Sequence, residues 1–164
     1  MQGMTKRERQ ITDEAQILEI LQKGKVLHLG LAVDNEPYVV PMNYGFTYEE
    51  GKLVMYLHSA VRGKKLDMIR KNPKVFFEIC TDLQPFDGVK PCQYGLAYSS
   101  VMGKGTATIV EEVQEKMQAM TTLMKTQTEK DFVFNEELVS IVAVVRIDVE
   151  AYTAKHRPVP ERLR

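Results

Sequence analysis

No apolar run in this 164-residue sequence approaches the roughly 18 residues that indicate a membrane span. The first ten residues are polar and basic, and no apolar signal-peptide segment follows them, so we expect a cytoplasmic protein. Met4 is an alternative start to Met1. Net charge is absent as well, with 22 basic and 22 acidic residues, whereas a general nucleic-acid binder usually carries a basic excess. We expect neither a membrane nor a nucleic acid as a partner.

Cysteine is scarce, and motifs built on cysteine or histidine are missing. Cys80 and Cys92 belong to no CxxC motif and to no Cys/His cluster of zinc spacing. We therefore expect two reduced thiols, no disulfide scaffold and no metal site. The sequence also has no HExxH pair, no nucleophile elbow and no GxxxxGK(S/T) motif. These absences exclude the zinc, serine-hydrolase and P-loop sites that such motifs build.

The patterns that are present predict a mainly β protein in a single domain over residues 1–164, with a core at about 11–158 and flexible tails. We expect helices at 12–24, 63–71 and from 113 onward, and strands at 25–33, 38–48, 52–58, 75–79, 94–110 and 138–153. The short connections and the absence of a βαβ rhythm favour a closed or nearly closed six-stranded antiparallel barrel with helices outside it.

Several details of this fold are specific enough to check. The first three strands are joined by tight turns and should form an antiparallel meander. Residues 83–91 contain two prolines and a glycine and should be a loop. The strand at 94–110 should bend at Gly103 and Gly105. One stripe of the last helix should consist of Val113, Met117, Met120 and Met124.

The most informative segment for function is YLHSAVRGKK, residues 56–65. A strand ends at His58 and a helix begins near Gly63, and residues 62–74 hold six basic side chains and one acid. A helix N-terminus offers free N–H groups and the positive end of the dipole, which together can hold a phosphate. The alternative is an ordinary solvated basic helix face.

Two further segments carry weaker signals. In VVPMNYG, residues 39–45, Pro41 removes a ladder hydrogen bond and leaves backbone groups and Asn43 free for a flat heterocycle, unless it simply marks an edge strand. Tyr98, Ser99 and Ser100 can serve a ligand or face solvent. His28 lies inside an apolar strand, as core histidines do.

Taken together, residues 39–79 resemble the pyridoxamine-phosphate-oxidase-like flavoproteins, most closely the Nim-type nitroimidazole resistance group. The segments YSSVMGKGTATIVEE and VVRIDVEAYTAKHRP fit the same group, so the resemblance covers about residues 11–158. It implies a split β-barrel and a homodimer with FMN, or FAD, at the subunit interface. The chain lacks the arginine- and histidine-bearing substrate motif of true pyridoxamine phosphate oxidases, so vitamin B6 oxidation is not expected.

The resemblance also assigns roles to residues. The isoalloxazine ring would contact Val40, Pro41, Met42 and Asn43; the ribityl chain, His58, Ser59 and Ala60; and the phosphate, Arg62, Lys64 and Lys65. Tyr98, Ser99 and Ser100 would reach the flavin from the other subunit. No residue is required by sequence to be an acid or base, and His58, Tyr44 and Tyr98 are the nearest candidates.

Two functions follow from this resemblance. The first is an FMN-dependent oxidoreductase that passes electrons to small aromatic nitro compounds or quinones. The second is a binding protein that stores flavin or holds haem, with His156 as a candidate axial ligand.

Overall fold

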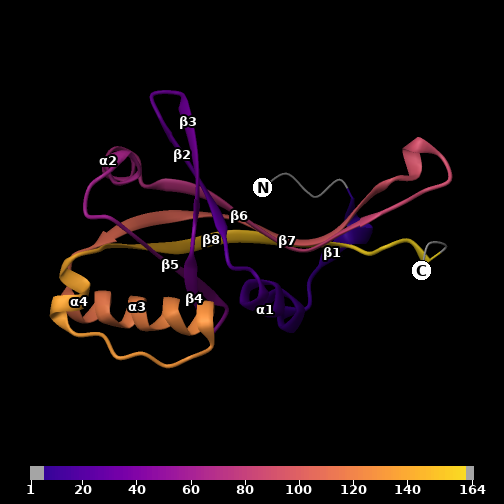
Figure 1. Cartoon of the computed structure of the whole chain (residues 1–164). Coiled ribbons are helices and arrows are strands. Elements are labelled where there is room, and N and C mark those ends of the chain that lie inside the picture. The colour runs from indigo at the N-terminus through magenta and orange to yellow at the C-terminus, as the bar shows by residue number, and fades with distance from the viewer. Residues whose placement is uncertain (1–5, 162–164) are drawn as a thin grey trace.

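The computed structural model describes residues 6–161 and is built mainly from β-strands (Figure 1). The possible starts at Met1 and Met4 lie outside these residues. The elements, in chain order, are η1 Arg7–Arg9, β1 Gln10–Ile11, α1 Glu14–Lys23, β2 Leu27–Val33, β3 Glu36–Met42, β4 Tyr44–Glu49, β5 Lys52–Ser59, α2 Lys64–Lys71, β6 Lys74–Phe86, η2 Pro91–Gln93, β7 Gly95–Val110, α3 Val113–Thr128, α4 Glu136–Ser140 and β8 Ala143–Arg157.

The sheet has eight strands and not the predicted six, because the expected strand 38–48 is two strands and the short β1 adds another. All strand pairs are antiparallel, and the strands follow the order β3-β2-β6-β7-β8-β5-β4, with β1 paired to β8. β3 and β4 therefore lie at opposite ends of this order, yet only Asn43 separates them in the chain. The sheet must curl until its two edges meet at Asn43. No ladder joins β3 to β4, so the structure is an antiparallel barrel that is split between these two strands.

Both antiparallel pairings of the predicted meander are present, but its middle strand is not continuous. β2 pairs with β3 and β4 with β5, but the predicted single strand 38–48 is two strands that turn apart at Asn43. The alternation nevertheless continues across the break, because Tyr38, Val40, Met42, Tyr44, Phe46 and Tyr48 all belong to the core or pack against it. β4 lies at the opposite end of the strand order from β3 because it pairs with β5, and β5 pairs on its other side with β8.

Two element boundaries and the buried face of α3 also differ from expectation. β6 continues through Leu83 and Pro85 to Phe86, where a loop is predicted. Residues 136–140 form α4 instead of the start of the last strand, and Ile141 is 72% exposed. On α3 the buried residues are Ala119, Met120, Leu123 and Thr126, so only Met120 of the predicted stripe is buried. The register of β7 shifts between Lys104 and Gly105, which confirms the bend.

The helices are fixed to the barrel by close contacts. The Asp13 side chain accepts a hydrogen bond from the Gln16 amide and caps α1. Tyr44 is fully buried, and its hydroxyl donates a hydrogen bond of 2.6 Å to the Leu21 carbonyl, which links β4 to α1. α3 packs so closely on β4 that a Cβ at Gly45 would collide with the Leu123 backbone. Among the described residues, no helix is both long and apolar enough to span a membrane.

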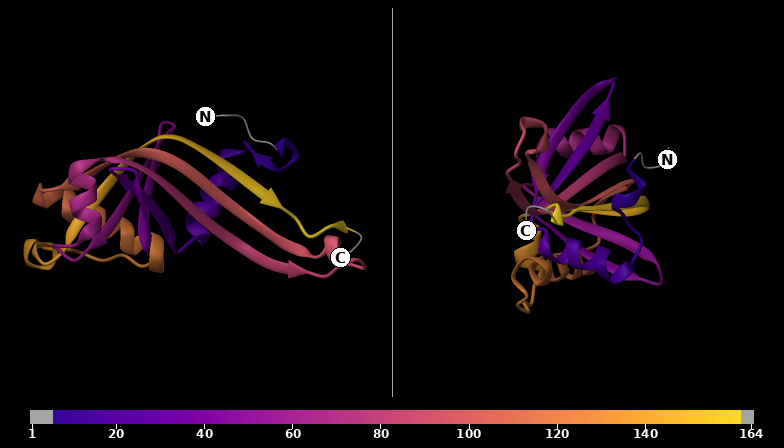
Figure 2. Two further views of the ribbon diagram at one scale, coloured as in Figure 1. Left: turned by 90° about the horizontal axis from the view of Figure 1, so that it is seen from above. Right: turned by 90° about the vertical axis from the view of Figure 1, so that its right-hand side faces the viewer.

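The β6–β7 hairpin, with the end of β8 beside it, projects away from the rest of the molecule (Figure 2). Phe86, the last residue of β6, is buried, and the Arg157 guanidinium lies 5.0 Å from the centre of the Phe86 ring. At the tip, the Gln93 side-chain oxygen accepts hydrogen bonds from the amides of Val89 and Lys90. The projecting hairpin is therefore a folded structure with its own internal bonds.

Candidate functional site

The turn from β5 into α2 is shaped to hold an anion. Gly63 precedes the helix with φ 151° and ψ 160°, a conformation essentially restricted to glycine. The first backbone bonds of α2 are donated by Leu66 and Asp67 to the Gly63 carbonyl, so the earlier amides of Lys64 and Lys65 have no role in the helix ladder. Arg62 is exposed and Lys65 half-buried beside these amides.

Lys64 is already engaged within the chain. Its ammonium lies 4.9 Å from the centre of the Tyr38 ring on β3, a cation–π contact. It also lines a cavity of about 410 Å³ together with Asp34, Glu36 and Asp67. Tyr38 is two residues from Val40, so this contact places the start of α2 beside the strand that is expected to face the flavin ring.

His58, the last residue but one of β5, has a feature that sequence cannot show. Its Nδ1 atom is buried and has no hydrogen-bond partner among the described residues. Burial lowers the pKa of His58 below its ordinary value of 6.5. A buried polar atom without a partner costs free energy unless a ligand or water supplies one. His58 is therefore a neutral side chain prepared to accept a bond from, or donate one to, a bound molecule.

Alternation along β5 separates His58 from Ser59. His58 shares the face of Tyr56, which packs toward Val110 and Met120, whereas Ser59 shares the face of the fully buried Leu57. The Ser59 hydroxyl donates a hydrogen bond of 2.9 Å to the Ala60 carbonyl, and Ala60 is exposed. The strand thus presents a different polar group on each side of its end.

The segment at the end of β3 presents backbone more than side chains. Val40 and Met42 pack into the core, while Pro41 is exposed. β3 is an end strand of the sheet, so half of its backbone polar groups have no ladder partner and can meet the polar edge of a heterocycle. The Asn43 amide donates to the Lys25 carbonyl at 3.0 Å and faces the Gln127 side-chain oxygen at 3.3 Å.

Gln127 is the residue near this site that sequence reasoning missed. Its side-chain nitrogen donates to the carbonyl of Tyr44 at 2.7 Å and to that of Lys25 at 3.2 Å. It therefore joins β4 to Lys25, which comes shortly before β2, beside the split at Asn43. A glutamine near the end of a helix carries no sequence signal for this role.

Tyr98, Ser99 and Ser100 do not share one face of β7. Ser99 is buried on the inner face, where its hydroxyl lies 3.0 Å from His156 Nδ1 beside a cavity of about 330 Å³ shared with α1. Tyr98 and Ser100 point to the opposite, outer face. Tyr98 is half-buried there and Ser100 is only 7% exposed, so of the two residues that face the outside of the sheet, Tyr98 is the more open.

The predicted site residues form two groups that one chain holds far apart. His58 pairs with Val144 and Ser100 pairs with Lys155, so the two are eleven residues apart along β8. At about 3.3 Å per residue this is about 35 Å along the strand. That path is longer than one FMN molecule.

The outer face of β3, β2, β6 and β7 carries apolar side chains without a covering helix. A groove of about 790 Å³ lies over it, lined by Gly30, Ala32, Val39, Phe76 and Lys104 among others. Val39 is 64% exposed, Phe76 40% and Met102 38%. An uncovered apolar sheet face of this kind marks an interaction surface.

Other candidates have structural roles. Tyr44 is fully buried and its hydroxyl is committed to Leu21, so it does not reach a ligand. His28 is exposed, not in the core, and its Nδ1 lies 3.0 Å from Glu78. Cys80 and Cys92 are both free thiols. Within residues 6–161, no group of three His, Cys, Asp or Glu side chains could hold a metal ion.

Comparison with known proteins gives consistent matches. The sequence profile of pyridoxamine 5′-phosphate oxidase matches residues 13–156. A candidate 5-nitroimidazole antibiotic resistance protein of Bacteroides thetaiotaomicron superimposes with a TM-score of 0.76 at 27% identity, covering 90% of this chain and 86% of that chain. No curated protein matches in sequence.

Two more distant structures show the fold alone. A FAD-binding protein of Mesorhizobium loti has a TM-score of 0.64 at 22% identity, covering 92% of this chain and 98% of that chain. A FAD and haem binding protein of Mycobacterium smegmatis has a TM-score of 0.77 at 12% identity, covering 93% of this chain and 76% of that chain. The split barrel expected from the sequence is the fold of these structures.

Proposed function

The chain belongs to the pyridoxamine 5′-phosphate oxidase family, and from this premise we propose that it is a homodimeric FMN-binding oxidoreductase that reduces small aromatic acceptors. The observation that carries the proposal is the end of β5, where the unpartnered Nδ1 of His58 and the free amides at the start of α2 lie seven residues or fewer apart in the chain. FMN has polar groups along its ribityl chain and a phosphate at its end, which match this order.

The residues of the chain would divide the work of binding. Lys65, Arg62 and the first amides of α2 hold the phosphate through charge-assisted bonds. His58 meets the ribityl chain, whereas the Ser59 side chain lies on the other face of β5. Pro41 and the free edge of β3 lie against the ring, and the Asn43–Gln127 contacts keep that edge in place.

The dimer is supported by the position of Tyr98 and Ser100. Both lie on the outer face of the sheet, about 35 Å along β8 from His58, so they can meet a flavin held at His58 only from a second copy. The exposed Val39, Phe76 and Met102 lie on that same face and supply the apolar area that an isologous interface needs.

When bound, the flavin would accept two electrons from an external donor and pass them to an acceptor. We propose nitroaromatic compounds and quinones as acceptors, because the candidate 5-nitroimidazole resistance protein of Bacteroides is 27% identical in sequence to this chain. The chain itself supplies the apolar surroundings and the neutral His58.

Two measurements test this function. Purified protein should show the two broad near-ultraviolet and blue bands of a flavin. After reduction with dithionite under anaerobic conditions, stopped-flow mixing with metronidazole or menadione should return the oxidised spectrum. A flavin that reoxidises with oxygen but with no nitroaromatic and no quinone would leave a storage role only.

Haem binding is the second candidate, and one observation favours it. His156 Nδ1 is held at 3.0 Å by the buried Ser99 hydroxyl, which leaves Nε2 for a ligand, as in many metal-binding histidines. Titration with haemin separates the two functions. A Soret band in the wild type that is lost in His156→Ala would support haem binding. No Soret band in the wild type would leave flavin binding as the proposed function.

A further inference from the structure

A cavity continues from the turn that is proposed to hold the flavin phosphate. It has a volume of about 410 Å³ and lies between α2 and the β2–β3 hairpin, which are neighbours in the fold (Figure 1). Pockets that bind small molecules usually measure about 300–1,000 Å³. The cavity is lined by Val33, Asp34, Glu36, Lys64, Asp67, Met68 and Lys71. Its size and position suit a chemical group that is attached to the phosphate.

The walls of this cavity are held in place by contacts within the chain. Asp34 and Asn35 form the two-residue turn between β2 and β3, and their φ values of 54° and 65° are those that a type I′ turn requires. The side-chain nitrogen of Asn72, at the end of α2, donates a hydrogen bond of 2.9 Å to the Ala32 carbonyl on β2. Met68 is buried and supplies an apolar part of the wall. The cavity is therefore a fixed feature of the chain.

Two successive lysines begin α2, and they lie on different sides of the helix. Successive helical residues point about 100° apart, because the helix has about 3.6 residues per turn. Lys65 is half-buried beside the free amides, whereas the Lys64 ammonium lies 4.9 Å from the centre of the Tyr38 ring and lines the cavity. Lys64 therefore places a positive charge where a chain of two phosphate groups would enter the cavity.

The carboxylates on the hairpin side of the cavity have no partner within the described chain. Asp67 pairs with Arg70 at 3.0 Å, but Asp34 and Glu36 make no ion pair and no side-chain hydrogen bond among residues 6–161. Two free carboxylates repel a phosphate, so they match neutral hydroxyl donors instead. A ribose offers two such hydroxyls, and an acidic side chain accepts a hydrogen bond from ribose in dinucleotide sites.

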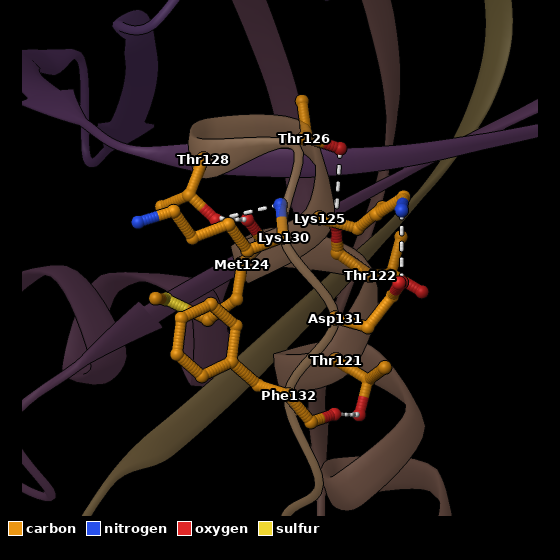
Figure 3. A network of polar contacts seen from close by, with 9 residues as sticks. All are labelled: Thr121, Thr122, Met124, Lys125, Thr126, Thr128, Lys130, Asp131 and Phe132. Atoms are coloured by element: carbon orange, nitrogen blue, oxygen red, sulfur yellow. Dashed lines mark hydrogen bonds and ion pairs between the residues drawn. The ribbon is translucent and has the colours of Figure 1, made fainter.

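The segment after α3 shows a different treatment of exposed charge (Figure 3). There the Lys125 ammonium pairs with Asp131 at 2.8 Å, and the amide of Lys130 donates to the Thr128 hydroxyl at 3.2 Å. These contacts order the segment with groups of the chain itself. The carboxylates of Asp34 and Glu36 stay open to a ligand.

Resting on the proposed function, we propose that the complete flavin site takes FAD, with the adenosine half in the cavity beside α2. The diphosphate lies between the free amides of α2 and Lys64. The ribose hydroxyls donate to Asp34 and Glu36, and the adenine base packs on Val33 and Met68. FMN fills only the first part of this site.

Binding of the two flavins to the apoprotein tests this assignment. In a fluorescence titration, the wild type should bind FAD at least about tenfold more tightly than FMN, because FAD adds hydrogen bonds to charged groups. Asp34→Gly with Glu36→Ala removes both carboxylates and should abolish that preference while the affinity for FMN is retained. Glycine accepts the positive φ at position 34, so the turn is preserved.

Glu49→Ala is the matched control. Glu49 is also an exposed carboxylate beside a hairpin turn, but it is the last residue of β4 and does not line the cavity. This variant should keep the wild-type affinity for both flavins. Mass spectrometry of the flavin that heat releases from the purified protein is an independent measurement and should identify FAD.

Three results would overturn this inference and leave the proposed function standing. The first is FMN binding that equals or exceeds FAD binding. The second is a preference for FAD that survives the double substitution, since another part of the chain would then hold the adenosine. The third is a double variant with a raised KM for NADH and an unchanged Kd for FAD, because the cavity would then hold the adenosine of the electron donor. Protein that binds neither flavin would overturn both the inference and the proposed function.

Discussion

The ammonium of Lys64, the first residue of α2, lies 4.9 Å from the centre of the Tyr38 ring on β3. This contact joins the proposed phosphate end of the site to the strand that is proposed to face the flavin ring. Lys64 thus has a structural partner in addition to its expected ligand, while Lys65 is the cation beside the free amides.

Replacing Lys64 and Lys65 together with Ala should weaken FMN binding by at least about a hundredfold, since charge-assisted contacts contribute about 1.5–3 kcal/mol each. Riboflavin lacks the phosphate and should lose far less. Fluorescence titration of the apoprotein with both flavins measures the difference. Lys71→Ala, at the other end of α2, is the control; Lys74 is unsuitable because it pairs with Glu150 at 2.7 Å. If FMN affinity were unchanged, the basic run would be a solvated helix face.

Gly63→Ala should both destabilise the protein and weaken FMN binding. At φ 151° and ψ 160° an L side chain is strained by about 1–3 kcal/mol, and relief of that strain would move the first amides of α2. Gly51, with φ 79° in the β4–β5 turn, is a matched control. Gly51→Ala should lower the free energy of unfolding while FMN affinity stays at its wild-type value. Equal losses of FMN affinity in the two variants would contradict the proposed role of Gly63.

His58 should make stability depend on pH. Because burial lowers its pKa, the unfolded chain binds the proton more readily than the folded chain does. Its contribution is complete above the ordinary pKa of 6.5 and is lost as pH falls through that value toward the lower folded pKa. His58→Asn should therefore lose less stability than wild type on acidification, as measured by urea unfolding of the apoprotein. An NMR titration midpoint for His58 at or above 6.5 would rule this out.

The dimer should have twice the 18.7 kDa mass of the chain in light scattering at micromolar concentration. Phe76→Asp places a charge in the middle of the uncovered sheet face and should give a monomer that has lost its flavin, since Tyr98 and Ser100 would no longer be supplied by a partner. Val133→Asp changes a residue that is 94% exposed and should have no effect on either property. A Phe76→Asp monomer that retains flavin would refute the shared site.

The parts of the fold with local signals could be predicted from sequence. α1 lies within the predicted range 12–24, with Asp13 at its N-cap and Gly24 at its C-cap, and the bend of β7 coincides with its glycines. The split at Asn43 could not be predicted, because the apolar alternation stays in phase from Tyr38 to Tyr48 although the two strands diverge. α4 has five residues, too few for a helical period to show.

The candidate site shows the same division. The basic turn after His58 was visible in the sequence because its chemistry is local. The sequence could not show that His58 Nδ1 is buried without a hydrogen-bond partner, because that depends on how the surrounding elements pack. The alternation of side chains along β7 is enough to place Ser99 on one face of the strand and Tyr98 and Ser100 on the other. The sequence does not show which of these faces is covered, because that depends on where α1 packs. The distance between Ser100 and His58 follows only from the register of β8 with both neighbours.

The place of β8 in the sheet has a consequence for synthesis of the protein. It is the last strand in the chain, yet it lies between β7 and β5. A nascent chain that ends before residue 143 holds two separate pieces of sheet, β3-β2-β6-β7 and β5-β4, each with an open edge. Those edges can pair with other chains during the seconds that elongation takes. Closure of the barrel therefore waits for the segment Ala143–Arg157, however early the hairpins form.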